Sequence, residues 1–243
     1  ELRRGQVAGS RQWDNEHPHY VGVPGMNAIG KARASRLDVR LDTAGTSLKR
    51  TGTRWRLVGD GQSPLGEFDW VIVTAPAAQA ADLLASTWIA SAAERVRMQA
   101  CFALMLGFDE AVDLPWQAAL VHDADISWIS VNSSKPGRSG SSSLVVHSTN
   151  DWANAHADDD TEAVRRHLLD EFREVTGIDG ASAPFVDVHR WRYANVDPQE
   201  GDLYVLDPDK QLAACGDWFV RGRVEGAFSS ADALAERLMV GDT

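Results

Sequence analysis

Apolar runs and turn signals near the two ends of the chain predict strands that belong to one α/β unit. The run Trp70-Val71-Ile72-Val73 lies in a strand predicted over residues 68–74, and its continuity is typical of a parallel-sheet strand covered on both faces. Further strands are predicted over residues 54–59 and 212–215.

Helical patterns accompany these strands. Pro76 opens an alanine-rich helix, because proline is well accepted in the first helical turn, and Pro24 predicts a helical turn after the extended start of the segment 20–30. A C-terminal helix is predicted over residues 225–240. Its expected buried face consists of Ala227, Ala231, Leu234 and Leu238.

The middle of the chain has a different pattern, with short strands joined by polar loops. Strands are predicted over residues 101–108, 126–131, 144–149 and 185–193, and the serine-rich segment 133–143 is predicted as a loop. One helix interrupts them, with an acidic start that we interpret as a solvated helix end, an apolar stripe, and Gly177 as its stop. The stripe consists of Val164, Leu168, Phe172 and Val175.

This order predicts an α/β fold, α+β overall, in which one domain is inserted into another. Residues 20–90 and 206–243 are expected to form the α/β domain. Residues 1–19 and 91–205 are expected to form a mainly antiparallel domain.

Composition narrows the function classes. The 243 residues carry 35 acidic and 24 basic side chains, a formal net charge of −11, which argues against nucleic acid as a partner. No apolar run approaches the ~20 residues that span a bilayer. Only two cysteines, Cys101 and Cys215, are present, too few for a disulfide framework, so we expect a cytoplasmic protein. We also expect a monomer or a weak dimer. No zinc-binding or phosphate-binding motif is present, so no metal site is predicted.

The candidate chemistry follows the last predicted strand. Gly216 permits close backbone approach, Asp217 can accept hydrogen bonds from sugar-like hydroxyls, and the helix beginning near Glu225 offers free N–H groups to an electron-rich ligand. A Gly-Asp turn before a helix is also an ordinary α/β connection.

Several segments, in this order, resemble the FAD-containing amine oxidase superfamily and, more narrowly, its bacterial renalase branch. They run through nearly the whole chain. The segments are Tyr20-Val21-Gly22-Val23-Pro24-Gly25-Met26-Asn27-Ala28-Ile29, Trp70-Val71-Ile72-Val73-Thr74-Ala75-Pro76-Ala77-Ala78-Gln79-Ala80, Asn132-Ser133-Ser134-Lys135-Pro136, His189-Arg190-Trp191-Arg192-Tyr193-Ala194, Cys215-Gly216-Asp217-Trp218 and Gly222-Arg223-Val224-Glu225-Gly226-Ala227.

The resemblance implies that FAD is bound noncovalently by the α/β domain. This domain would be Rossmann-like and, in this sequence, incomplete. An inserted, mainly antiparallel substrate domain would lie above the FAD. Asp217 would bind the ribityl or phosphate region, and the helix start would face the pyrimidine edge of the flavin, where charge develops on reduction. The residues implied in cofactor binding are Thr74, Ala75, Pro76, Gly216, Asp217, Arg223, Val224, Glu225, Gly226 and Ala227.

The sequence departs from that family at one place. Relatives begin with a strand, a G-x-G-x-x-G turn and a helix, and this sequence contains no such segment. We therefore expect the chain to represent a C-terminal portion of a longer flavoenzyme.

On the substrate side, the resemblance implies oxidation of isomeric dihydronicotinamide forms of NAD(P)H, with dioxygen as acceptor. His147 is the candidate catalytic residue, and His189, Trp191 and Tyr193 share a strand face that could hold a flat ring. The same aromatic pattern is typical of a packed sheet face, and a lone strand histidine is often structural. Oxidation of a small amine, or a non-catalytic remnant without FAD, are the alternatives.

Overall fold

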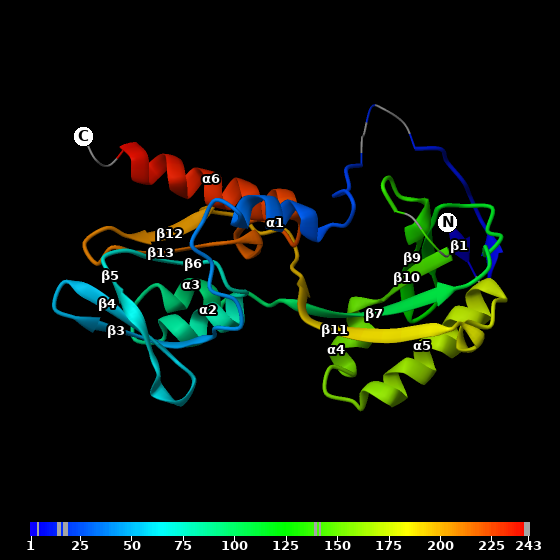
Figure 1. The fold of residues 1–243 in the computed structure, drawn as a ribbon, viewed down its shortest axis with the longest axis horizontal. Coiled ribbons are helices and arrows are strands. Elements are labelled where there is room, and N and C mark those ends of the chain that lie inside the picture. The colour runs from blue at the N-terminus through cyan, green and yellow to red at the C-terminus, as the bar shows by residue number, and fades with distance from the viewer. Residues whose placement is uncertain (4, 14–15, 17–18, 139, 141, 241–243) are drawn as a thin grey trace. The chain divides into compact units, whose positions relative to one another are not determined.

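The computed structural model describes residues 1–3, 5–13, 16, 19–138, 140 and 142–240 (Figure 1). The chain divides into two compact units. Unit 1 contains Glu1–Val39 and Ala100–Arg192, and unit 2 contains Arg40–Gln99 and Tyr193–Thr243. This division differs from the predicted domain limits, because residues 20–39 group with unit 1, and residues 91–99 and 193–205 group with unit 2.

Unit 1 is built on a mainly antiparallel sheet, as predicted. Among the described residues its strand order is β11-β7-β10-β9-β8-β1-β2. β10 pairs antiparallel with β7 and β9, β8 pairs antiparallel with β9, and β1 pairs parallel with β8. The strands are β1 (Leu2–Arg3), β2 (Gln6–Val7), β7 (Gln99–Phe108), β8 (Ala118–His122), β9 (Ile126–Val131), β10 (Ser142–Ser148) and β11 (Phe185–Asn195).

Helices α4 (Asn150–Ala155) and α5 (Thr161–Thr176) cover one face of this sheet (Figure 1). The four stripe residues predicted for α5 are all buried in the core of unit 1. Asp160 caps the helix by accepting hydrogen bonds from the amides of Glu162 and Ala163, and Gly177 ends it with φ of 74°. The predicted apolar stripe and the predicted stop at Gly177 are therefore confirmed, and the structure adds Asp160 as the N-cap.

Three other features of unit 1 refine the prediction. Helix α1 (Asn27–Ala34) begins three residues after Pro24, so the expectation that Pro24 occupies its first turn is wrong. The predicted loop contains the 3-10 helix η2 (Asn132–Ser134), and β10 begins before that loop was expected to end. A second 3-10 helix, η3 (Gly180–Ser182), precedes β11.

Unit 2 contains two small sheets, ordered β12-β13-β6 and β3-β4-β5. β13 pairs parallel with β6, as predicted, and antiparallel with β12. The strands are β3 (Gly45–Thr51), β4 (Arg54–Gly59), β5 (Pro64–Phe68), β6 (Val71–Val73), β12 (Tyr204–Asp207) and β13 (Leu212–Cys215).

The single strand predicted over residues 68–74 is wrong. β5 ends at Phe68 and pairs with β4, whereas β6 begins at Val71 and pairs with β13, so the chain changes sheets between them. β6 is an edge strand among the described residues, and Ile72 is 44% exposed. Within the described residues, β6 is therefore not covered on both faces by other elements, contrary to the prediction from the sequence.

The helices of unit 2 are α2 (Ala77–Leu84), α3 (Ala90–Glu94) and α6 (Val224–Val240), with 3-10 helices η1 (Asp60–Gln62) and η4 (Asp217–Phe219). Pro76 caps α2, as its sequence position predicts. In α6 the buried residues are Gly226, Ser230 and Leu234, whereas Ala231 is exposed. The predicted face is wrong at Ala231, because the buried residues Gly226, Ser230 and Leu234 are four apart and share one side of the helix, and Ala231 lies about 100° around the helix from Ser230.

Two further findings concern the whole chain. Cys101 and Cys215 are free thiols, and burial raises the pKa of each. No helix in the described part of the chain is both long and apolar enough to cross a membrane.

Candidate functional site

The residues proposed for the cofactor come together at one sheet edge of unit 2. β6 and β13 are parallel, with Val73 opposite Ala214, so Thr74, which follows β6, and Cys215, the last residue of β13, lie at the same edge. The indole N–H of Trp218 donates to the carbonyl oxygen of Ala75 at 3.0 Å and connects the two turns. The structure thus unites Thr74-Ala75-Pro76 with Gly216-Asp217, which lie 140 residues apart in sequence.

Gly216 is held in place by a buried hydroxyl group. Its amide donates to Ser230 Oγ at 2.8 Å, and that hydroxyl donates to the carbonyl oxygen of Leu203 at 2.6 Å. A Cβ at Gly216 would approach Nε1 of Trp218 to 2.9 Å. Only glycine therefore allows the indole to pack against this backbone, and the absence of a side chain leaves the strand end open to close approach.

The Asp217 carboxyl is partly buried at the start of η4. Burial raises its pKa, and hydrogen bonds from the backbone amides of Trp218 and Asp217 itself counteract part of that rise. No described Lys or Arg side chain forms an ion pair with it. The carboxyl group is therefore an acceptor that a hydroxyl-bearing ligand can use.

Helix α6 begins seven residues after Asp217. The first backbone bond into the helix is from the Ala227 amide to the Arg223 carbonyl at 3.1 Å, and the amides of Val224, Glu225 and Gly226 have no backbone acceptor among the described residues. Val224 is 61% exposed. Free amides and the helix dipole supply partial positive charge at this end.

These groups fit the edge of a flavin. An open glycine turn, a carboxyl group without an ion pair and a row of free amides are the donors and acceptors that ribityl hydroxyls and a developing negative charge require. Gly226 is buried against the segment before the helix, because a Cβ there would overlap the carbonyl oxygen of Arg221. A side chain at this position would therefore push the first turn of α6 away from the segment before it.

The second group of residues lies on the face of the unit 1 sheet that is opposite α4 and α5. Ala103 is paired with His147, and Gly107 of the same strand lies beside Phe185, since a Cβ at Gly107 would be 3.2 Å from Cβ of Phe185. Alternation along β7 and β11 then places His147, Phe185, His189 and Trp191 on one face.

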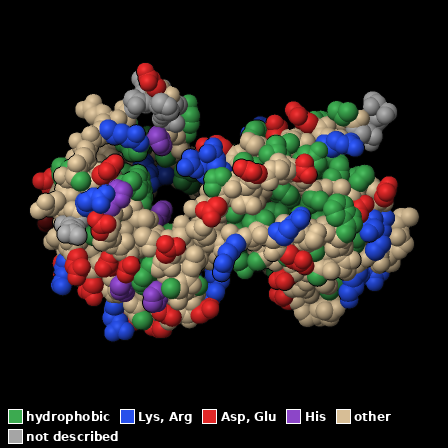
Figure 2. Space-filling view, turned by 180° about the vertical axis from the view of Figure 1, so that it is seen from behind, with side chains coloured by type: hydrophobic (Ala, Val, Ile, Leu, Met, Phe, Trp, Pro, Cys, Tyr) green, Lys and Arg blue, Asp and Glu red, His purple; other side chains and the backbone are tan. Residues whose placement is uncertain are grey.

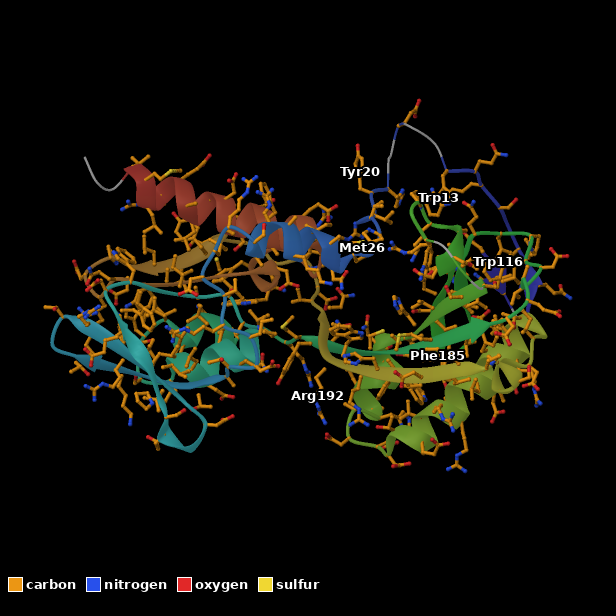
Figure 3. All side chains as sticks on the ribbon, viewed as in Figure 1. Trp13, Tyr20, Met26, Trp116, Phe185 and Arg192 are labelled. Atoms are coloured by element: carbon orange, nitrogen blue, oxygen red, sulfur yellow. The ribbon has the colours of Figure 1, made fainter. Side chains whose placement is uncertain are left out.

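This face is open in the described part of unit 1. Phe185 and Trp191 are 56% and 53% exposed, and the rings of His189 and Trp191 meet edge to face at 4.2 Å. Figure 3 shows Phe185 on this side of β11 and Arg192 pointing to the other side, where it pairs with Asp158 at 2.7 Å. The predicted aromatic face is therefore not a packed core face within unit 1.

Tyr193 lies in the part of β11 that belongs to unit 2, and it is 36% exposed. Arg223, also in unit 2, has an exposed side chain, and its amide donates to the carbonyl oxygen of Arg221 at 2.7 Å.

His147 is half-buried, and its pKa is lowered by burial and by the positive charge of Lys135. The Lys135 ammonium donates to Asn132 Oδ1 at 3.2 Å and to Ser130 Oγ at 3.4 Å. Burial and the charge of Arg138 lower the Lys135 pKa in turn. Near neutral pH, His147 is therefore a neutral imidazole beside a cation, with one ring nitrogen that can donate a hydrogen bond and one that can accept a hydrogen bond.

Sequence reasoning missed Lys135 as a site residue. It lies in the segment Asn132-Ser133-Ser134-Lys135-Pro136, which carried part of the family resemblance, but a lysine in a serine-rich loop has no distinguishing pattern. A 3-10 turn and the amide of Asn132 bring its side chain back toward the sheet.

Solved structures of several oxidases share this fold. A protein assigned as a protoporphyrinogen oxidase from Exiguobacterium sp. 255-15 matches 89% of this chain with a TM-score of 0.71 at 16% identity. Cyclohexylamine oxidase from Brevibacterium oxydans IH-35A matches 81% with a TM-score of 0.56 at 15% identity. A putrescine oxidase redesigned in cofactor binding matches 86% with a TM-score of 0.57 at 13% identity.

The chain spans about half the length of these structures, with 51%, 48% and 52% of them covered. The likeness confirms the predicted mixed α/β fold class.

A family described as flavin-containing amine oxidoreductase matches residues 10–239. That description names a flavin, so the predicted FAD is confirmed as the cofactor class of the family. The match covers nearly the whole chain, and the protein belongs to the family of flavin-containing amine oxidoreductases.

Proposed function

We propose that the protein is part of a renalase-like FAD-dependent oxidase that converts isomeric dihydronicotinamide forms of NAD(P)H, with dioxygen and a proton, into NAD(P)+ and hydrogen peroxide. The observation that carries this proposal is the open face of unit 1 that bears neutral His147 and exposed aromatic rings. The FAD would supply the hydride acceptor.

The chemistry of this face suits a flat, neutral ring. Trp191 and Phe185 offer exposed apolar surface for stacking, and His147 can hydrogen-bond a carboxamide without adding a charge. Lys135 next to His147 favours ligands with anionic parts, such as the phosphates of a dinucleotide, over a protonated amine. Hydride transfer depends chiefly on position, so this site needs no strong base.

The cofactor would be held by unit 2. Asp217 would accept hydrogen bonds from ribityl hydroxyls, Gly216 would permit close approach, and the amides of Val224 and Glu225 would face the electron-rich edge of the ring. Thr74-Ala75-Pro76, at the same sheet edge, would pass the phosphates or the adenosine.

We also propose that FAD is held together with a Gly-rich segment outside these 243 residues. The free edge of β6, with Trp70 and Ile72 41% and 44% exposed, supports a further parallel strand at this position. Figure 2 shows hydrophobic side chains gathered on the surface of unit 2, as a face covered by additional polypeptide would present.

Oxidation of a small amine is the second candidate. Asp187 alternates with Phe185 and His189 on the same face and is exposed, so it could receive an ammonium group. Two of the similar structures are oxidases named for the amines putrescine and cyclohexylamine. A non-catalytic remnant that holds no FAD is the third candidate.

Anaerobic mixing separates these functions. The purified chain is first incubated with FAD, and flavin absorbance is measured after removal of free cofactor. Bleaching of bound flavin by isomeric dihydronicotinamides, and not by putrescine or cyclohexylamine, is expected. Bleaching by the amines alone would establish the second candidate, and no flavin uptake would favour a chain that needs the additional segment or has lost FAD.

The free thiols of Cys101 and Cys215 support the proposal that the reaction takes place in the cytoplasm.

A further inference from the structure

Three potential metal ligands meet on the surface of unit 1, away from the open face just described. Asp125 lies in the turn between β8 and β9, and His167 and Glu171 are four residues apart on α5. One ligand atom from each of these residues lies within 4.8 Å of the other two. Residues four apart share one side of a helix, so α5 presents an imidazole and a carboxylate to the turn.

The existing hydrogen bonds hold this group in a ligand-like arrangement. Asp125 Oδ2 lies 2.8 Å from His167 Nε2, and the Asp125 amide donates to Glu171 Oε2 at 2.8 Å. The amide of Thr149 donates to the Asp125 carbonyl at 2.7 Å and fixes the turn. One oxygen of each carboxylate remains available for a cation.

The ring of His167 is also fixed in orientation. It stacks on the indole of Trp152 in α4, with ring centroids 4.6 Å apart and planes 7° from parallel. A ligand whose ring is already oriented loses little conformational freedom on binding, which favours coordination.

We propose that Asp125, His167 and Glu171 form a binding site for a divalent transition metal of the Zn²⁺ class. Two ligands at about 2.1 Å from a tetrahedral ion lie roughly 3.4 Å apart, so the Asp125–His167 separation of 2.8 Å has to widen by only about 0.6 Å to admit the ion. Imidazole nitrogen selects transition metals over Mg²⁺ and Ca²⁺. The side chains of His167 and Asp125 are 39% and 42% exposed, so water completes the coordination sphere.

Binding changes one hydrogen bond. The ion replaces the hydrogen bond between His167 and Asp125: it coordinates His167 Nε2 and a carboxylate oxygen of Asp125, and the imidazole binds in its neutral form with its proton on Nδ1. Bound metal then cross-links the β8–β9 turn to α5. Its role is to stabilise unit 1, independently of the proposed oxidase reaction.

A neighbouring pair supplies a matched control. His156 Nδ1 lies 2.7 Å from Asp159 Oδ2, and the His156 ring also stacks on Trp152, at 4.5 Å and 25°. This pair shares the His–Asp contact and the stacking but belongs to no group of three potential ligands among the described residues. His156→Asn therefore tests whether a stacked His–Asp pair is sufficient.

The test is a calorimetric titration of the full chain, without a histidine tag, with ZnCl₂. We expect one Zn²⁺ per chain, an affinity at least tenfold lower in Glu171→Gln and Asp125→Asn, and no change in His156→Asn. Zn²⁺ at 100 times its dissociation constant should raise the Tm by roughly 5 to 10 °C in the wild type. Far-ultraviolet circular dichroism checks that each variant is folded.

Absence of Zn²⁺ binding to the wild type would overturn the proposal. So would an unchanged affinity in Glu171→Gln, if that variant is folded, or an equal loss in His156→Asn. An equal rise of the Tm with MgCl₂ would contradict the assignment to a transition metal.

Discussion

Two influences shift the pKa of His147, and both shift it in the same direction. Burial and the charge of Lys135 both disfavour the imidazolium, so the folded pKa lies below that of the unfolded chain. The unfolded chain therefore binds a proton at this residue first as the pH falls below about 6.5. The contribution of His147 to the free energy of unfolding is therefore complete above that pH and decreases progressively below it.

Removing the neighbouring charge should raise this pKa. We expect Lys135→Met to shift the pKa of His147 upward, since burial then acts without the lysine charge. The measurement is a pH titration of the His147 ring protons by NMR. Arg173→Gln, on the exposed side of α5, is the control and should leave the titration unchanged. A pKa that stays in place in Lys135→Met would show that burial alone determines it.

Asp217 is a second residue that affects the stability of the fold, because its carboxyl group is partly buried. Its pKa is raised by burial, so the folded state is most favoured while the carboxyl group is neutral, and stability is lost as the pH rises through the folded pKa. A half-buried carboxylate kept at this cost is typical of a binding site.

We expect Asp217→Asn to raise the Tm at pH 7 and to have a smaller effect at pH 3, while FAD retention by the assembled protein falls. Thermal unfolding at the two pH values and flavin absorbance after gel filtration measure both effects. Asp232→Asn, on the exposed side of α6, serves as the control. Unchanged flavin retention in Asp217→Asn would contradict the role proposed for this residue.

At the scale of elements, α6 connects the packing of unit 2 to the proposed cofactor edge. Its buried face is made of Gly226, Ser230 and Leu234, and Ser230 also fixes Gly216. The position of the free amides at its first turn therefore depends on a buried glycine and a buried serine, which a search for a hydrophobic stripe does not find.

A methyl group at Gly226 should displace this turn. We expect Gly226→Ala to destabilise unit 2 by about 1 to 3 kcal/mol, because the new Cβ would overlap the carbonyl oxygen of Arg221. Gly30→Ala in α1 meets no atom within 4 Å and should be neutral or stabilising by about 1 kcal/mol. Urea unfolding of both variants measures the difference. Equal stabilities would show that the segment before α6 yields without cost.

At the scale of the whole molecule, the free edge of β6 and the exposed apolar residues of unit 2 favour association. Edge strands with exposed apolar side chains pair readily with other chains. A further parallel strand would satisfy this edge, and without one a second copy can take its place.

We expect Ile72→Lys to reduce the self-association of the chain without lowering its Tm, because the side chain at this edge is 44% exposed. Light scattering over a range of concentrations measures the mass. Ile29→Lys, in α1, changes a side chain that is 45% exposed and serves as the control. Equal self-association in the wild type and Ile72→Lys would contradict a role for β6.

Local signals in the sequence determined several elements and the class of the protein. The acidic start, the apolar stripe and the stop at Gly177 predicted helix α5, and β4, β9 and β13 occur where their patterns place them. The family resemblance, read from ordered segments, is confirmed at the level of the flavin-containing family.

Only the tertiary structure decided how distant segments combine. The division between β5 and β6 depends on which strand each one pairs with, and an uninterrupted apolar run carries no information about partners. The placement of Lys135 beside His147, and of Asp125 beside α5, depends on loops that fold back onto other elements. Composition and periodicity describe neighbours along the chain, whereas these sites are made by neighbours in space.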